Sequence, residues 1–169
     1  MVPVSGSYRG LPGAVLYAYR NAGSRLFRSF VVVGAVVSLL LLFLFASGLV
    51  ALIADTASAR GGRFTVLRAF YVVVLLGLVA PVLAPILVVA RRRRRGSADG
   101  GGERAIALAG YGYLFALYVG AGVVGAPDAN EPAETGALGP VVAWLNGLPD
   151  AAGFVLPVVA ALVVAAVVR

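Results

Sequence analysis

The sequence contains no cysteine, no histidine and no lysine. Without cysteine and histidine the chain has no disulfide, no thiol nucleophile and none of the usual nitrogen and sulfur ligands of zinc and haem iron. Charged residues are also scarce, at 12% of the chain against about 25% in an ordinary soluble domain. Hydrophobic residues reach 61%, so we expect lipid, and not water, to surround most of the chain.

Chemically reactive patterns are missing as well. No acidic residue lies in the middle of an apolar segment, where pumps, exchangers and intramembrane enzymes usually carry an ionisable group. The sequence has no Gly-x-Ser-x-Gly elbow, no P-loop and no glycine-rich dinucleotide fingerprint. We therefore predict no enzymatic activity, no catalytic residue, no cofactor and no metal site.

The basic residues are all arginines, and they lie beside apolar segments. Lysine and arginine together number 14 against seven acids, for a formal net charge of +7. Five of them are consecutive: Arg91, Arg92, Arg93, Arg94 and Arg95. A strongly basic chain is often a nucleic-acid-binding protein, but no basic face with stacking aromatic residues lies outside the apolar segments. The expected partners are the lipid bilayer and its anionic headgroups, and not nucleic acid.

Four apolar segments are candidate membrane spans. The first, residues 30–54, is 25 residues long and uncharged. At about 1.5 Å per helical residue it can cross a hydrocarbon core of about 30 Å. It is longer than the apolar part of a signal peptide, about 7–15 residues, so we expect a retained span. Further spans are expected at about 64–90, 105–126 and 151–168, which predicts an all-α membrane protein with four transmembrane helices in an antiparallel up-down bundle.

The N-terminal segment and the last loop have opposite charge. Residues 1–29 carry four arginines and no acid, and Pro12 favours a helix start there. We expect a basic N-terminal segment with a helix lying in the membrane interface, followed by a transmembrane domain at 30–169. A disordered basic tail is the alternative. The loop 127–150 carries four acids and no basic residue, and its apolar stretch 138–148 with Trp144 is either interfacial or re-entrant.

The arginines also predict the orientation of the chain. With the N-terminus in the cytoplasm, the positive-inside rule is obeyed by eleven arginines, and the other three lie at the outer side or membrane edge (Arg60, Arg63 and Arg68). The cytoplasmic arginines are Arg9, Arg20, Arg25, Arg28, Arg91 to Arg95, Arg104 and Arg169. We therefore expect a multi-pass protein of the cell membrane with both termini in the cytoplasm. The run Arg91 to Arg95 is then either a topology signal alone or also a lipid headgroup site.

Small residues and prolines indicate how the helices pack. Small residues at intervals of four form a face in each of the last two spans, and such faces let helix backbones approach closely. The predicted packing residues are Gly112, Ala116, Gly120, Gly153, Ala161 and Ala165, with Pro157 in the same series. Pro81 and Pro85 each remove a backbone donor and predict a kink in the second span. A kinked helix can line a transport path, and it also occurs in inert membrane helices.

Three functions are compatible with these features. The first is a structural or accessory membrane component that interacts with a protein partner or with copies of itself. The second is an oligomeric channel or carrier in which the kinked second helix lines a path. The third is a membrane module that binds anionic lipid through Arg91 to Arg95.

Short strings before the first span carry a resemblance to known sequences. They are Tyr8-Arg9-Gly10-Leu11, Tyr17-Ala18-Tyr19-Arg20 and Ser24-Arg25-Leu26-Phe27-Arg28-Ser29. Together with the four-span layout, they resemble an uncharacterised family of small integral membrane proteins from halophilic archaea. The absence of lysine is similar to the composition of such high-GC genomes. The resemblance implies a location and a fold, and it brings no activity and no site residue with it.

Overall fold

The computed structural model describes residues 10–56, 62–96, 100–124, 139–149 and 151–169, and their regular structure is helical. The expectation of an all-α protein is therefore confirmed for these residues, among which no strand occurs. The helices are α1 (Gly10–Arg20), α2 (Arg25–Asp55), α3 (Gly62–Arg94), α4 (Gly100–Val124), α5 (Gly139–Asn146) and α6 (Ala152–Val168).

Three of these helices, α2, α3 and α4, are long and apolar enough to cross a membrane. Their lengths and compositions suggest a membrane-embedded protein. The fourth expected span corresponds to α6, a shorter apolar helix of 17 residues. Helix α5 lies within the apolar stretch 138–148, whereas the acids predicted for the outer loop lie outside the described residues: Asp128, Glu131, Glu134 and Asp150.

The chain divides into two compact units, Met1–Ala107 and Leu108–Arg169. The first contains α1, α2, α3 and the first two turns of α4. The second contains the rest of α4 together with α5 and α6. A helix, α1, is present within the segment for which an interfacial helix is predicted, and it belongs to the same compact unit as α2 and α3.

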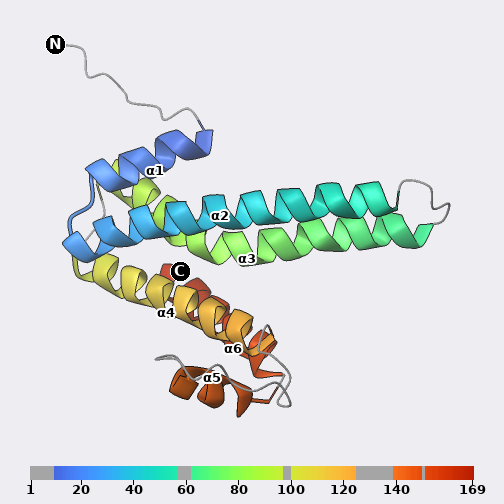
Figure 1. Ribbon diagram of the computed structural model, residues 1–169. Helices are drawn as coiled ribbons and strands as arrows, with labels where there is room; N and C mark the ends of the chain where they lie inside the picture. Colours follow the sequence, from blue (N-terminus) through green and yellow to red (C-terminus); the bar gives the residue numbers. More distant parts are fainter. Residues whose placement is uncertain (1–9, 57–61, 97–99, 125–138, 150) are drawn as a thin grey trace. The chain divides into compact units, whose positions relative to one another are not determined.

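In the first unit α2 and α3 run side by side as a long hairpin (Figure 1). The buried residues of α2 follow helical spacing along one stripe, which is the pattern of a helix with a single packed face. They are Phe27, Phe30, Val31, Gly34 and Ser38. Gly34 permits the close approach, since a Cβ there would lie 3.1 Å from Cγ1 of Val82 on α3. Beyond Ser38, most of α2 has its apolar side chains exposed, as expected of a lipid-facing helix.

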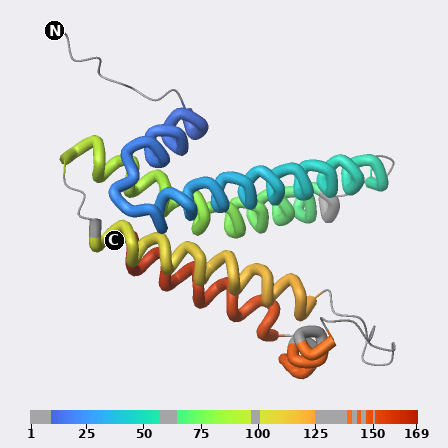
Figure 2. The backbone as a smooth tube through the Cα atoms, turned by 60° about the vertical axis from the view of Figure 1, so that its left-hand side comes forward, coloured from blue at the N-terminus to red at the C-terminus, as the bar shows by residue number. Residues whose placement is uncertain are grey.

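Helix α3 changes direction along its length. Its first part follows α2, and its last part, yellow-green in Figure 2, leads away from α2 and passes α1. Pro81 and Pro85 lie inside this continuous helix. Each lacks the N–H that would close a turn, and its ring crowds the carbonyl four residues earlier, so a bend costs less here than elsewhere. The turned end of α3 carries the arginine run and forms a support for α1.

Candidate lipid headgroup site

Helix α1 packs against the turned end of α3 through two alanines. Ala14 and Ala18, one helical turn apart, are each 1% exposed, and α1 contacts both α3 and α2. Alanine methyl groups are small enough to let two helix backbones approach closely. Gly10, with φ +74°, precedes the first turn, and Pro12 occupies a place in it where no N–H partner is required.

The corner between α1 and α2 is held by short-range hydrogen bonds. At the end of α1 the Asn21 side-chain amide donates to the carbonyl oxygen of Tyr17 over 2.9 Å. Ser24 is the N-cap of α2: its backbone is extended, and its hydroxyl accepts the N–H of Phe27 over 3.0 Å. A serine N-cap is worth about 1 kcal/mol of helix stability. These bonds place Gly23 at the tip of the corner.

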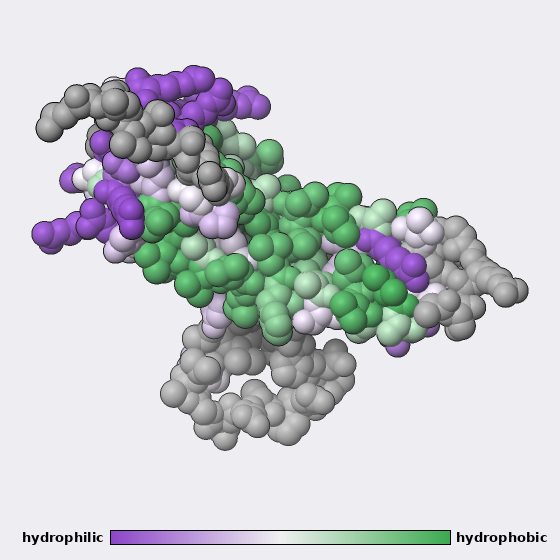
Figure 3. Space-filling model, turned by 90° about the horizontal axis from the view of Figure 1, so that it is seen from above, coloured by the Kyte–Doolittle hydropathy of each residue, from purple (hydrophilic) through white to green (hydrophobic). Residues whose placement is uncertain are grey.

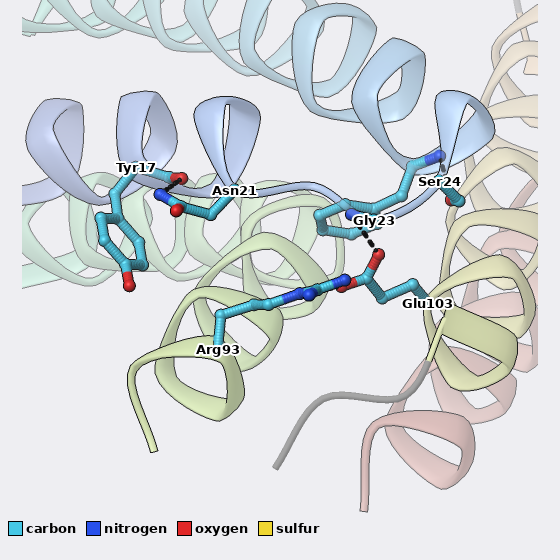
Figure 4. Close-up of polar contacts among 7 residues, drawn as sticks. Tyr17, Asn21, Gly23, Ser24, Arg93 and Glu103 are labelled. Atoms are coloured by element: carbon cyan, nitrogen blue, oxygen red, sulfur yellow. Dashed lines mark hydrogen bonds and ion pairs between the residues drawn. The ribbon is translucent and has the colours of Figure 1, made fainter. Parts of the chain in front are cut away.

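Glu103, in the first turn of α4, binds this corner to the arginine run. Figure 4 shows its carboxylate between Gly23 and Arg93. One oxygen accepts the Gly23 N–H over 2.8 Å, and the other accepts the Nε–H of Arg93 over 2.5 Å. Glu103 is only 2% exposed, so this ion pair is shielded on the acid's side. We call Gly23, Arg93 and Glu103 the Glu103 cluster.

A side chain in place of Gly23 would crowd the Glu103 cluster. A Cβ there would collide with Nη2 of Arg93, the flexible end of that side chain, and would lie 3.1 Å from Oε2 of Glu103. A substitution at Gly23 would therefore shift the Arg93 side chain away from its present position. The Glu103 cluster thus joins residues that are 80 positions apart in the sequence.

Two further arginines lie over tyrosine rings of α1. The guanidinium carbon of Arg94, on α3, is 5.7 Å from the ring centre of Tyr17. That of Arg28, on α2, is 5.4 Å from the ring centre of Tyr19. Cation–π contacts of this kind contribute about 0.5–1 kcal/mol at exposed sites. They bring cationic groups from both long helices to α1.

The exposed arginines at this end of the first unit, two of which lie over tyrosine rings of α1, are called the arginine surface. Its members are exposed arginines of α1, α2, α3 and α4, together with the exposed residue that follows α3: Arg20, Arg25, Arg28, Arg91, Arg94, Arg95 and Arg104. Figure 3 shows hydrophilic residues gathered at the end where α1 lies and hydrophobic residues along the α2–α3 hairpin. Leu11 and Leu16 of α1 are 55% and 50% exposed beside these charges. Apolar and cationic side chains on one short helix are typical of a headgroup-layer helix.

The five arginines of the run are indistinguishable in the sequence, whereas in the structure they differ in exposure and in their contacts. Arg91, Arg94 and Arg95 are exposed, and Arg92 and Arg93 are half-buried. Arg93 belongs to the Glu103 cluster, and Arg94 lies over Tyr17. The run therefore both holds α1 in place and presents charge outward. Sequence reasoning quoted Tyr17 and Tyr19 without identifying their arginine partners, and it did not single out Glu103, although an acid in a helix's first turn is a recognisable signal.

The other predicted residues lie away from the arginine surface. Pro81 is half-buried, and Pro85 is fully buried in α3. In the second unit α4 and α6 run side by side, as Figure 2 shows, and Gly120 and Gly153 lie at their contact. A Cβ on Gly120 would be 2.5 Å from the carbonyl oxygen of Gly153 and 3.0 Å from Cγ of Pro157.

The remaining predicted packing residues are less buried than Gly120 and Gly153. Gly112 is exposed, and apart from its own helix backbone no atom of the described residues lies within 4 Å of the place where its Cβ would be. Ala116 and Ala161 are half-buried, and Ala165 is exposed. The small-residue pattern alone does not show that Gly120 lies at the helix contact and that Gly112 is exposed.

The opposite end of the α2–α3 hairpin carries a second polar group. Arg68 of α3 donates from Nη2 to the hydroxyl of Thr56 over 2.6 Å and to the Thr56 carbonyl oxygen over 3.4 Å. Thr56, the C-cap of α2, donates its own hydroxyl hydrogen to the carbonyl oxygen of Leu52. Sequence reasoning placed Arg68 at the membrane edge and missed Thr56, because a cap residue is not recognisable as a partner without the helix pairing.

Across the described part of the chain, no group of three or more His, Cys, Asp or Glu residues is arranged to hold a metal ion. The model of a protein family described as Domain of unknown function (DUF8056) matches residues 3–169. No curated protein and no solved structure matches the chain.

Proposed function

The chain belongs to the family described as Domain of unknown function (DUF8056), and we propose that it is an accessory membrane protein whose arginine surface binds anionic lipid headgroups. One observation carries the proposal: α1 packs against α2 and α3, and guanidinium groups of both helices lie over its tyrosine rings. The buried carboxylate of Glu103 joins the corner between α1 and α2 to Arg93 of the arginine run. The side chains of Arg91 and Arg95 are exposed and bond to no described residue, so they can bind a lipid headgroup.

The proposed orientation brings this surface to the cytoplasmic leaflet. The positive-inside rule favours it, since eleven of the arginines then lie in the cytoplasm. Four spans are proposed, of which α6, with 17 residues, is at the lower end of the usual range of about 17–25. The cytoplasmic leaflet is also the one that carries most anionic lipid.

The energetic scale supports such binding. A basic residue near an anionic membrane surface contributes about 1 kcal/mol, and the attraction decays within about 8 Å at physiological ionic strength. The arginine surface comprises seven such residues at the end of the first unit where α1 lies, so several of them can act on the same patch of lipid. Insertion of Leu11 and Leu16 into the headgroup layer adds an apolar contribution.

The proposal assigns no catalytic step to the protein. The chain lacks cysteine and histidine and has no acid in the central part of an apolar segment, so the groups that usually perform membrane-embedded chemistry are not supplied. An accessory role, in which the protein organises lipid or a membrane partner, requires only the arginine surface and apolar helices.

The test removes two charges without touching the Glu103 cluster. Arg91 and Arg95 are exposed, and neither side chain bonds to a described residue. We expect the Arg91→Gln/Arg95→Gln variant to bind anionic lipid at least tenfold more weakly, because two contributions of about 1 kcal/mol are lost. The measurement is the partition of fluorescent anionic and zwitterionic lipids between bulk bilayer and nanodiscs that contain the purified protein.

The matched control is Arg60→Gln/Arg63→Gln, which removes the same charge from the connection between α2 and α3 and from the first turn of α3. It should leave the anionic-lipid preference of the wild-type protein unchanged. High salt should weaken the wild-type preference. An unchanged preference in the Arg91→Gln/Arg95→Gln variant would refute the proposed function.

A further inference from the structure

Arg68 is a cation within an apolar helix pair. It lies three residues inside the candidate span Thr65–Arg94, at the end of the hairpin opposite the arginine surface. At about 1.5 Å per residue this is about 4.5 Å of depth. The headgroup layer is roughly 5–7 Å thick on each side, from the difference between a total bilayer of about 40–45 Å and a core of about 30 Å. The guanidinium therefore reaches phosphate depth.

The protein orients this guanidinium without neutralising it. Its partner among the described residues is Thr56, whose hydroxyl and carbonyl oxygens are both uncharged acceptors. The Thr56 hydroxyl donates to Leu52, so its lone pair is turned toward Arg68. Asp55 is the adjacent residue in the sequence, but it is exposed and forms no ion pair with Arg68.

The guanidinium of Arg68 has N–H donors that are not bonded to any described residue. A guanidinium has five N–H donors, and here only Nη2 is bonded to a described residue. Its Nε is buried and has no hydrogen-bond partner in the described part of the chain. Arg68 as a whole is only half-buried, so a ligand can approach it from outside the hairpin. Because Nε is covered, a ligand from outside would bond to the Nη N–H groups that Thr56 leaves unused.

We propose that Arg68, positioned by Thr56, binds a phosphate group at this end of the α2–α3 hairpin. A guanidinium presents a planar pair of donors that matches two phosphate oxygens, and Arg–phosphate pairs are often bidentate. The shared chemistry is a phosphate oxyanion, supplied either by the diester of a phospholipid or by free phosphate. The site depends on membrane insertion of α2 and α3, and it does not depend on the arginine surface.

The first experiment measures the NMR resonance of the Arg68 guanidinium in the wild-type protein. The full chain, labelled with ¹⁵N-arginine, is placed in nanodiscs of phosphatidylcholine and in nanodiscs of a glycolipid without phosphate. The Nε–H resonance of Arg68 is assigned by its loss in Arg68→Lys. The Arg93 resonance serves as an internal reference, because its Nε–H already donates to Glu103.

Each outcome of this experiment decides the proposal. A shift of the Arg68 resonance in phosphatidylcholine alone supports a phospholipid phosphate. A similar shift when inorganic phosphate is added to the glycolipid nanodiscs supports the same site with a free ion as the ligand. Identical Arg68 resonances under all three conditions would overturn the proposal.

The second experiment counts bound lipid. Native mass spectrometry of the protein released from phosphatidylcholine nanodiscs should show retained phospholipid on the wild-type chain and on Arg68→Lys. Arg68→Gln should lose roughly tenfold in retention, because a charge-assisted hydrogen bond is removed. Arg91→Gln/Arg95→Gln should retain phosphatidylcholine like the wild type, so failure of this site is distinguishable from failure of the anionic-lipid surface. Equal retention by Arg68→Gln and the wild type would contradict the site.

Discussion

At the scale of single residues, Glu103 has a role that its charge alone does not reveal. In a count of loop charges it offsets one of the neighbouring arginines. In the folded chain it is 2% exposed and accepts two hydrogen bonds, from the Gly23 N–H and from Arg93. A buried carboxylate is stable only when such partners are present. Glu103 therefore determines where α1 lies and which arginines face outward.

We predict that Glu103→Gln destabilises the first compact unit by about 1.5–3 kcal/mol, the usual value of a hydrogen bond to a charged group. The amide oxygen can still accept the Gly23 N–H, whereas the charge that pairs with Arg93 is lost. The measurement is thermal unfolding in detergent micelles followed by circular dichroism. The matched control is Asp55→Asn, which removes an exposed acid that forms no ion pair with another described residue and should change little. Equal effects of both substitutions would show that the ion pair contributes no stability.

At the scale of secondary-structure elements, close contacts between helices depend on glycine at particular positions. Gly34 allows α2 to approach Val82 of α3, and Gly120 allows α4 to approach the backbone of Gly153 on α6. Water does not drive helices together inside a bilayer, so close van der Waals packing is a main source of their attraction. A methyl group at such a contact must push the partner helix away, and a backbone atom cannot yield as a flexible side chain can.

Two alanine substitutions on α4 test this directly. Gly120→Ala should cost about 1–3 kcal/mol, because its Cβ would lie 2.5 Å from the Gly153 carbonyl oxygen. Gly112→Ala meets nothing within 4 Å and should stabilise the helix by about 0.5–1 kcal/mol, since alanine loses less backbone entropy than glycine. The measurement is resistance to unfolding by sodium dodecyl sulfate. Equal losses in both variants would contradict the α4–α6 contact.

At the scale of the whole molecule, the distribution of charge along the chain predicts its orientation. Arginines flank the ends of α2 and α3 that lie near α1, whereas the connection between α2 and α3 and the loop after α4 carry fewer arginines or only acids. The proposed topology follows from this asymmetry under the positive-inside rule.

The topology can be measured with single cysteines, because the chain contains none. We expect an impermeant thiol reagent applied to intact cells to label Thr135→Cys and to spare Ser97→Cys. The physical reason is that the two positions are separated by one proposed span, α4, and only one of them faces the medium. Labelling after membrane rupture is the control, and both variants should then react. Labelling of Ser97→Cys in intact cells, with Thr135→Cys protected, would reverse the orientation.

The amino-acid sequence by itself determined the helical class and the approximate extent of the three helices that are long and apolar enough to cross a membrane. Apolar runs of this length have few alternatives in lipid, where backbone groups must be bonded within a helix or closed barrel. The presence of a helix beginning near Pro12 also followed from local signals. These properties depend on neighbouring residues, so periodicity and composition are sufficient to predict them.

Only the tertiary structure decided which residues meet. The Gly23 N–H and the Glu103 carboxylate are 80 positions apart, and Thr56 and Arg68 are 12 positions apart across a helix reversal. It also separated Gly120, in contact with α6, from Gly112, which is not. Pairings of this kind depend on where the chain reverses and on how the helices pack against one another. They cannot be predicted from the local composition. The five arginines that look equivalent in the sequence differ in the folded chain for the same reason: Glu103 and Tyr17 each lie beside one of them.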